Sequence, residues 1–85
     1  MAFVYVLSSL KDNKLYIGST RQALEDRLKR HNTGQVNSTK YRVPFVLLYS
    51  ESLSNYSDAR KREVYFKSGS GRESLLRILS NRAGT

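Results

Sequence analysis

The chain contains no cysteine, and this absence limits its possible folds more than any other feature of the sequence. Without cysteine there is no disulfide scaffold, thiolate zinc site, iron–sulfur cluster or cysteine nucleophile, and a single histidine excludes a histidine-rich zinc site. The 85 residues must therefore be stabilised by apolar packing, in one domain over residues 1–85. A domain of this size buries only about 60–70% of its unfolded surface, so we expect a thin core.

The sequence contains neither a membrane-spanning segment nor a signal peptide. No apolar run approaches the roughly 20 residues that a membrane helix needs. The first residues, Met1-Ala2-Phe3, lead directly into a strand-like pattern, without a basic segment followed by an apolar one. We therefore expect a soluble, cytoplasmic protein that does not bind membranes.

Apolar spacing predicts three strands and three helices. The strands are expected at 3–7, 15–17 and 45–49, and the helices at 20–32 (capped by Thr20), 57–67 (capped by Ser57) and 73–79. The order β-β-α-β-α-α indicates an α/β fold of the α+β kind, with a small, at least partly antiparallel sheet against helices.

Three local expectations follow from residue type. Gly18-Ser19-Thr20 should end the second strand, and Ser68-Gly69-Ser70-Gly71 should separate the last two helices. The segment Phe45-Val46-Leu47-Leu48-Tyr49 is apolar on both alternating faces, which is typical of a central strand.

The charge balance points to a polyanionic partner. The chain has fifteen Lys and Arg residues and seven Asp and Glu residues, which gives a net charge of +8, and the cations occur in both halves of the chain. A compact domain with this charge has a positive surface that attracts nucleic acid. The alternative is ordinary surface charge that keeps the protein in solution.

One carboxylate interrupts an apolar helical stripe. Tyr56, Ala59, Glu63 and Phe66 are spaced to share one face of the second predicted helix. A charge placed there needs a cation, a metal or an opening to solvent, because burying it unpaired costs several kcal/mol. Glu63 is thus a candidate metal ligand or acid–base group, and the alternative is an ion pair with Arg60 or Lys67.

The first predicted helix carries a second candidate pair. Arg27 and His31 are four residues apart and project from the same face. A guanidinium can bind a phosphate through two hydrogen bonds, and a neutral imidazole can relay a proton near pH 7. The alternatives are a solvated arginine and a structural histidine.

Tyrosines form the third candidate group. Tyr5 and Tyr16 lie on the first two predicted strands and can approach each other if these strands pair. Packing within the hairpin is the alternative explanation. A phenol acts as a base at pH 7 only if neighbouring cations such as Arg27, Lys14 and Arg21 lower its pKa.

Taken in order, these segments resemble the GIY-YIG nuclease family over residues 3–79. Val4-Tyr5-Val6-Leu7 and Leu15-Tyr16-Ile17-Gly18 are similar to its paired strands. Asp26-Arg27-Leu28-Lys29-Arg30-His31-Asn32 looks like its arginine–histidine helix, and Ala59-Arg60-Lys61-Arg62-Glu63 like the helix with its acidic metal ligand. The segments 38–41 and 67–72 resemble small stand-alone bacterial members. The chain departs from the family in having Val-Tyr-Val for Gly-Ile-Tyr, and its late asparagine has no secure counterpart.

The resemblance implies a three-stranded antiparallel sheet flanked by helices and an endonuclease that uses one divalent metal, Mg²⁺ or Mn²⁺. It assigns Tyr16 as general base or water-positioning group, Tyr5 as its support, and Arg27 as the phosphate ligand. His31 would assist proton transfer or contact the phosphate, and Glu63 would hold the metal. DNA is the expected substrate ahead of RNA, with a role in repair or recombination.

Seven further cations are expected to contact nucleic acid: Lys14, Arg21, Arg30, Lys40, Arg42, Lys67 and Arg72. So small a surface reaches few base edges, so intrinsic sequence specificity should be low unless a homodimer or a protein partner supplies it. The competing hypotheses are a non-catalytic nucleic-acid-binding module on the same scaffold and a basic, non-enzymatic partner within a larger complex.

Overall fold

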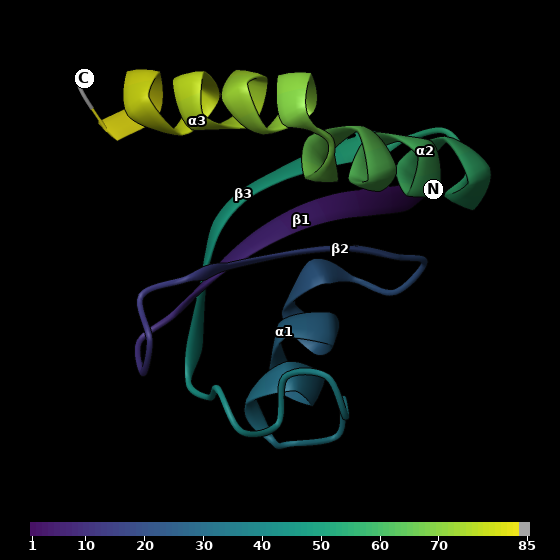
Figure 1. Cartoon of the computed structure of the whole chain (residues 1–85). Helices are drawn as coiled ribbons and strands as arrows, with labels where there is room; N and C mark the ends of the chain where they lie inside the picture. The colour runs from purple at the N-terminus through teal and green to yellow at the C-terminus, as the bar shows by residue number, and fades with distance from the viewer. Residues whose placement is uncertain (84–85) are drawn as a thin grey trace.

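The protein is a three-stranded antiparallel sheet with helices on both faces (Figure 1). The computed structural model describes the backbone of residues 1–83 and the side chains of residues 1–81. The elements are β1 Ala2–Ser9, β2 Leu15–Thr20, α1 Leu24–Asn32, β3 Phe45–Leu53, α2 Tyr56–Lys67 and α3 Gly69–Ala83. This order confirms the predicted β-β-α-β-α-α arrangement. None of the described helices is long and apolar enough to cross a membrane.

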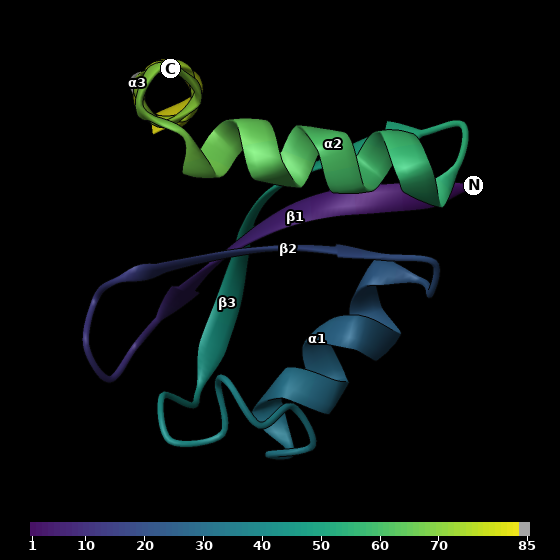
Figure 2. The ribbon, with the colours of Figure 1, turned by 45° about the vertical axis from the view of Figure 1, so that its right-hand side comes forward.

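The sheet separates two apolar clusters because successive side chains of a strand point to opposite faces. Val4 and Val6 of β1 pack with Ile17, Phe66 and Leu75 under α2 and α3. On the other face the core consists of Tyr5, Leu7 and Phe45, with Tyr16, Leu24, Leu28 and Val43 packed against it. Figure 2 shows α1 on one side of the sheet and α2 on the other, with α3 seen end-on.

β1 is the central strand, and the prediction that 45–49 is central was wrong. The strand order is β2-β1-β3, so β3 forms an edge. Its Val46, Leu47 and Leu48 are about two-fifths exposed, and a bulge opposite Val6 and Leu7 shifts the register there. Both β1 and β3 are apolar on two faces, and this pattern alone cannot say which of them lies inside the sheet.

The predicted helix starts and the predicted end of the second strand at Ile17 were also wrong. Gly18, Ser19 and Thr20 continue β2, and the Thr20 hydroxyl accepts a hydrogen bond from the Gln22 amide instead of capping the helix. α1 starts only at Leu24. α2 is capped by Asn55, whose side chain accepts from the Asp58 amide at 2.8 Å, and not by Ser57.

The last helix is longer than predicted, and it includes Gly71, a residue that packs closely against the end of α2. α3 starts at Gly69, so only Ser68 separates it from α2. A Cβ atom on Gly71 would lie 1.6 Å from the Tyr65 carbonyl oxygen, whereas one on Gly69 would meet nothing within 4 Å. The close approach of α3 to the end of α2 therefore requires Gly71.

This contact predicts opposite effects for two neighbouring glycines. Gly71→Ala should lower the free energy of unfolding by more than about 2 kcal/mol, because the α2–α3 junction must open to admit a methyl group. Gly69→Ala is the matched control and should be neutral or stabilising by up to about 1 kcal/mol. Urea unfolding of the two variants checks this, and equal effects would contradict it.

Candidate active site

Tyr5 lies at the centre of a polar cluster buried beneath α1. Its side chain is 2% exposed. Its hydroxyl oxygen lies 2.8 Å from His31 Nε2 and accepts a hydrogen bond from Arg27 Nε at 3.1 Å. Arg27 and His31, predicted to share a face of one helix, thus meet at the same phenol.

Gly18 allows the Tyr5 hydroxyl to lie against β2. Tyr5 and Gly18 are directly opposite each other in the β1–β2 pair. A Cβ atom on residue 18 would lie 2.5 Å from the Tyr5 hydroxyl oxygen, which is too close for any side chain. The glycine is therefore required by the position of this phenol.

His31 is held as a neutral imidazole between two hydroxyl groups. It is fully buried, and Nδ1 lies 2.8 Å from Thr39 Oγ1. Nε2 lies at the same distance from the Tyr5 hydroxyl, so each ring nitrogen has a hydroxyl partner. Burial, followed by the charges of Arg27 and Arg30, lowers the pKa of His31 from 6.5 to about 4.

Tyr5 is not made a base by its cationic neighbour. Burial raises the pKa of Tyr5 and outweighs the opposing effect of Arg27, so the expectation that cations lower it is wrong for this tyrosine. Tyr16 is half-buried, and its ring centroid lies 6.4 Å from that of Tyr5 and 5.1 Å from that of His31. Of the two tyrosines, Tyr16 is therefore the more exposed to solvent.

The depressed pKa of His31 predicts acid sensitivity of the fold. The unfolded chain takes up a proton on this imidazole near its ordinary pKa of 6.5, whereas the folded chain resists until about pH 4. Stability should therefore fall as the pH drops from 6.5 to 4, because the unfolded state binds more protons in this window. Urea unfolding of wild type and His31→Gln across these pH values should show a weaker pH dependence in the variant. NMR titration of the wild-type imidazole should show no transition between pH 5.5 and 8, and a midpoint near 6.5 would contradict the assignment.

Glu63 is buried on the opposite face of the sheet and has three partners. The residue is 6% exposed, as the interrupted apolar stripe predicted. Ser19 Oγ donates to its Oε1 at 2.5 Å, and Lys67 Nζ and Arg60 Nη1 each lie 2.7 Å from Oε2. Burial acts to raise the pKa of Glu63, but hydrogen bonds from Lys67, Ser19 and Arg60 outweigh it and hold the pKa below its ordinary value. Both ion pairs considered from the sequence are thus present.

The two groups of candidate residues meet at one point of the edge strand β2. Gly18 faces the Tyr5 hydroxyl on the α1 side, and the next residue, Ser19, bonds Glu63 on the α2 side. Among the described residues no hydrogen bond links Glu63 directly to Tyr16 or Arg27. Gly18 and Ser19 are therefore the point of this edge strand at which the two groups come closest along the chain.

The donor chemistry at Glu63 suits a largely hydrated divalent cation. No group of three or more His, Asp or Glu side chains converges among residues 1–81. Mg²⁺ commonly binds proteins through one or two carboxylates and keeps several waters, and one ionised carboxylate beside the Ser19 hydroxyl fits this mode. Lys67 and Arg60 now lie against the same carboxylate, but their side chains are 49% and 55% exposed and can turn into solvent.

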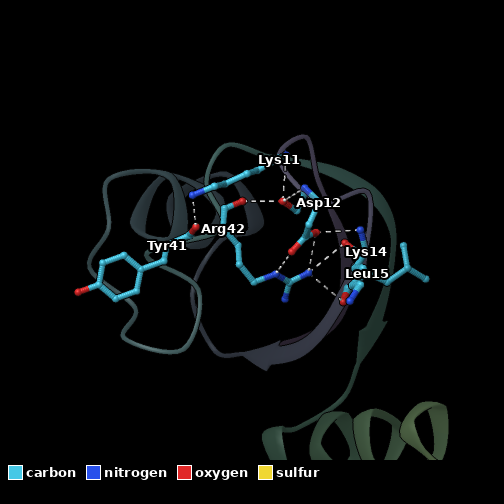
Figure 3. Close-up of polar contacts among 7 residues, drawn as sticks. Lys11, Asp12, Lys14, Leu15, Tyr41 and Arg42 are labelled. Carbon is cyan, nitrogen blue, oxygen red and sulfur yellow. Dashed lines mark hydrogen bonds and ion pairs between the residues drawn. The ribbon is translucent and has the colours of Figure 1, made fainter.

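The cations predicted to contact nucleic acid differ in whether other groups of the protein already bind them. Arg42 is engaged inside the protein, because its guanidinium binds Asp12 and the carbonyls of Lys14 and Leu15 (Figure 3). The Arg42 hydrogen bonds hold the pKa of Asp12 well below its usual range. Lys40 and Arg21 lie over aromatic rings, Arg21 4.4 Å from the centroid of Tyr56. Lys14, Arg30 and Arg72 are exposed and form no ion pair with a described residue.

Three polar side chains at the site carried no signal in the sequence. Ser19 holds Glu63, Thr39 is hydrogen-bonded to His31 Nδ1, and Asn32 binds both the amide and the carbonyl of Phe45 with its side-chain amide. The Asn32 contacts tie the end of α1 to the start of β3. A serine after a strand glycine and a threonine in a polar loop show no periodicity, so pattern analysis does not single them out.

Comparison with known proteins identifies the fold family. A family model described as the GIY-YIG catalytic domain matches residues 1–75. The chain belongs to the GIY-YIG family. GIY-YIG proteins are a nuclease family, so the match supports nucleic acid as the class of substrate.

Small proteins of the UPF0213 group share this domain. The UPF0213 protein of Staphylococcus haemolyticus is 40% identical over 77 residues, covering 89% of this chain and 92% of that protein. The UPF0213 protein of Clostridium perfringens is 38% identical over 84 residues, covering 98% and 87%. The solution NMR structure of the UPF0213 protein BH0048 from Bacillus halodurans superposes with a TM-score of 0.52 at 29% identity, covering 92% of this chain and 85% of that one.

Proposed function

We propose that this GIY-YIG chain is an endonuclease that hydrolyses phosphodiester bonds in DNA, with one divalent metal ion and little intrinsic sequence specificity. The observation that carries the proposal is the meeting of two groups at Gly18–Ser19. One group is the Arg27–Tyr5–His31 chain with Tyr16, and the other is the buried carboxylate of Glu63. A phosphate ligand and a metal ligand on either side of one edge strand suit a one-metal phosphodiester cut.

Arg27 binds the scissile phosphate in this proposal. Its Nε is fixed by the Tyr5 hydroxyl, and no other hydrogen bond or ion pair holds its guanidinium among the described residues. The terminal nitrogens are therefore oriented and free to donate to phosphate oxygens as negative charge develops. Tyr5, held in turn by His31, orients Arg27 and does not act as a base.

Tyr16 acts on the attacking water. Tyr16 is half-buried, and its hydroxyl orients the water oxygen toward phosphorus. A new phosphorus–oxygen bond to this water forms as the bond to the leaving strand breaks, and the water proton passes to solvent. Mg²⁺ or Mn²⁺ would be held by Glu63 and would supply Lewis-acid stabilisation of the phosphate and the leaving oxygen. His31 keeps the Tyr5–Arg27 pair in place through its neutral ring.

Nicking of supercoiled plasmid DNA tests the proposal. Wild-type protein should nick the plasmid with Mg²⁺ or Mn²⁺ and not with EDTA, and Arg27→Ala and Glu63→Ala should bind DNA without nicking it. Binding should weaken steeply with salt, because the released counterions dominate affinity. Wild-type protein that binds DNA and never cuts with either metal would overturn the enzymatic assignment.

One observation favours a second function, a non-catalytic nucleic-acid-binding module. Lys67 and Arg60 already neutralise Glu63, as in a purely structural ion-pair cluster. In that case neither wild type nor Glu63→Ala would nick the plasmid. The affinity of Glu63→Ala for DNA would differ from that of wild type only by the small effect of freeing the charges of Lys67 and Arg60. Any sequence preference of the nuclease itself would have to come from a second copy or another protein.

A further inference from the structure

The two carboxylate oxygens of Glu63 have different kinds of partner. Oε1 accepts from the hydroxyl of Ser19, which belongs to strand β2. Oε2 faces two cations of its own helix, Lys67 Nζ and Arg60 Nη1, each at 2.7 Å. One oxygen is thus tied to the sheet, and the other is neutralised by long, flexible side chains.

These two attachments differ in how easily they are broken. Ser19 has a short side chain on a paired strand, so its hydroxyl can move little relative to Glu63. Lys67 is the last residue of α2, and its side chain is half exposed. Ion pairs at such positions add little stability, because solvent screens them and ordering the lysine costs conformational entropy. Lys67 can therefore leave Oε2 at small cost, whereas Ser19 stays.

We propose that Ser19 is a positioning residue for the metal ligand Glu63, and that Lys67 is a displaceable cation that occupies Oε2 in the metal-free protein. The inference rests on the proposed function, in which Glu63 holds the divalent metal. A divalent cation at Oε2 and the ammonium of Lys67 compete for the same oxygen and repel each other. Lys67 therefore weakens metal binding, and Ser19 strengthens it by fixing the carboxylate.

Direct Mn²⁺ binding to the full chain, measured by the electron paramagnetic resonance signal of free Mn²⁺, separates these roles. Lys67→Met should tighten Mn²⁺ binding by about three- to fivefold, the size expected for removing one exposed ion-pair partner. Ser19→Ala should weaken it by about tenfold or more, and Ser19→Thr, which keeps the hydroxyl, should restore most of the affinity.

Lys61→Met is the matched control for charge. Lys61 is exposed on the same helix and forms no ion pair with a described residue, so its removal changes the net charge equally without touching Glu63. Its Mn²⁺ affinity should stay within about twofold of wild type, because exposed charges beyond the site are screened. Thermal melts of every variant show whether a change in affinity reflects loss of the fold.

The outcomes distinguish this inference from the function on which it rests. Lys67→Met that binds Mn²⁺ no more tightly than wild type or Lys61→Met overturns the role of Lys67, and folded Ser19→Ala with unchanged affinity overturns that of Ser19. Both results leave metal-dependent cleavage intact. If neither wild type nor Lys67→Met binds Mn²⁺, Glu63 is not a metal ligand, and the metal-dependent function fails as well.

Discussion

Arg27→Ala should lower the single-turnover rate of plasmid cleavage by about 10²–10³-fold while changing DNA affinity severalfold at most. The reason is that, among the arginines whose side chains the structure describes, only Arg27 has its Nε fixed on a buried phenol, so its free donors are set for one phosphate. One phosphate contact among many contributes little to overall affinity, but it contributes much to the transition state when it lies on the scissile group.

Arg30→Ala is the matched control for this prediction. Arg30 lies on the same helix with the same charge, is exposed, and is not hydrogen-bonded to Tyr5. Its removal should weaken binding slightly and leave the rate at saturating protein unchanged. Arg27→Lys keeps the charge but cannot reproduce both the bond to Tyr5 and a forked phosphate contact, so it should remain strongly impaired. Equal rates for the two alanine variants would remove Arg27 from the catalytic site.

Tyr5→Phe tests whether Arg27 is positioned as proposed. The variant loses the hydroxyl that accepts from Arg27 Nε and leaves His31 Nε2 without its hydrogen-bond partner. If Tyr5 acts through Arg27, the double variant Tyr5→Phe with Arg27→Ala should cleave no more slowly than Arg27→Ala alone. Additive losses would indicate that Tyr5 touches the reacting groups itself.

The order of elements was predictable because each strand or helix has its own periodic spacing of apolar residues, and this spacing can be read directly from the sequence. The strand at Phe3–Leu7 and the helix around Leu24 and Leu28 pack as their periodicity indicated. The order of strands within the sheet was not predictable in the same way. The two-sided apolar pattern of Phe45–Tyr49 was taken for burial, but this strand lies at an edge with its side chains partly exposed.

Gly18 shows why local residue type can mislead. A glycine beside serine and threonine is typical of a break, and the sequence analysis ended the strand there. The structure continues the strand, because Gly18 is needed for the approach of the Tyr5 hydroxyl across the pair. The same error placed the helix cap at Thr20, three residues before the actual N-cap, Ala23.

The candidate site was predictable where it depends on helical spacing and not where it depends on loops. Arg27 and His31 are four residues apart and converge on Tyr5, and Glu63 is buried in its stripe. Thr39 reaches His31 from a loop far along the chain, so no local pattern could reveal it. The pKa of Tyr5 was misjudged because the sequence gives the charge of its neighbours but not the depth of its burial.

Glu63→Gln should lower the rate of plasmid cleavage by about 10²–10³-fold while leaving the protein folded. Glutamine keeps the shape and can still accept the hydrogen bond from Ser19, but it removes the charge that a divalent metal requires. Lys67 and Arg60 lose their partner, and because both are about half exposed the free energy of unfolding should change by about 1 kcal/mol or less at pH 7. Glu73→Gln, on the exposed surface of α3, is the control and should leave cleavage unchanged.

Glu63→Gln should also change how the stability of the protein depends on pH, which can be measured without a cleavage assay. The pKa of Glu63 in the folded protein is lowered below its ordinary value of 4.5, so its carboxylate stabilises the fold above that pH. This stabilisation is lost as the pH falls through 4.5 and below, because the unfolded chain takes up the proton first. Glu63→Gln should therefore lose less stability than wild type between pH 5 and pH 3 in urea titrations. If Glu63→Gln lost stability in acid as steeply as wild type, Glu63 would not be held ionised by Ser19, Lys67 and Arg60. If the variant still cut plasmid at the wild-type rate, the carboxylate would take no part in catalysis.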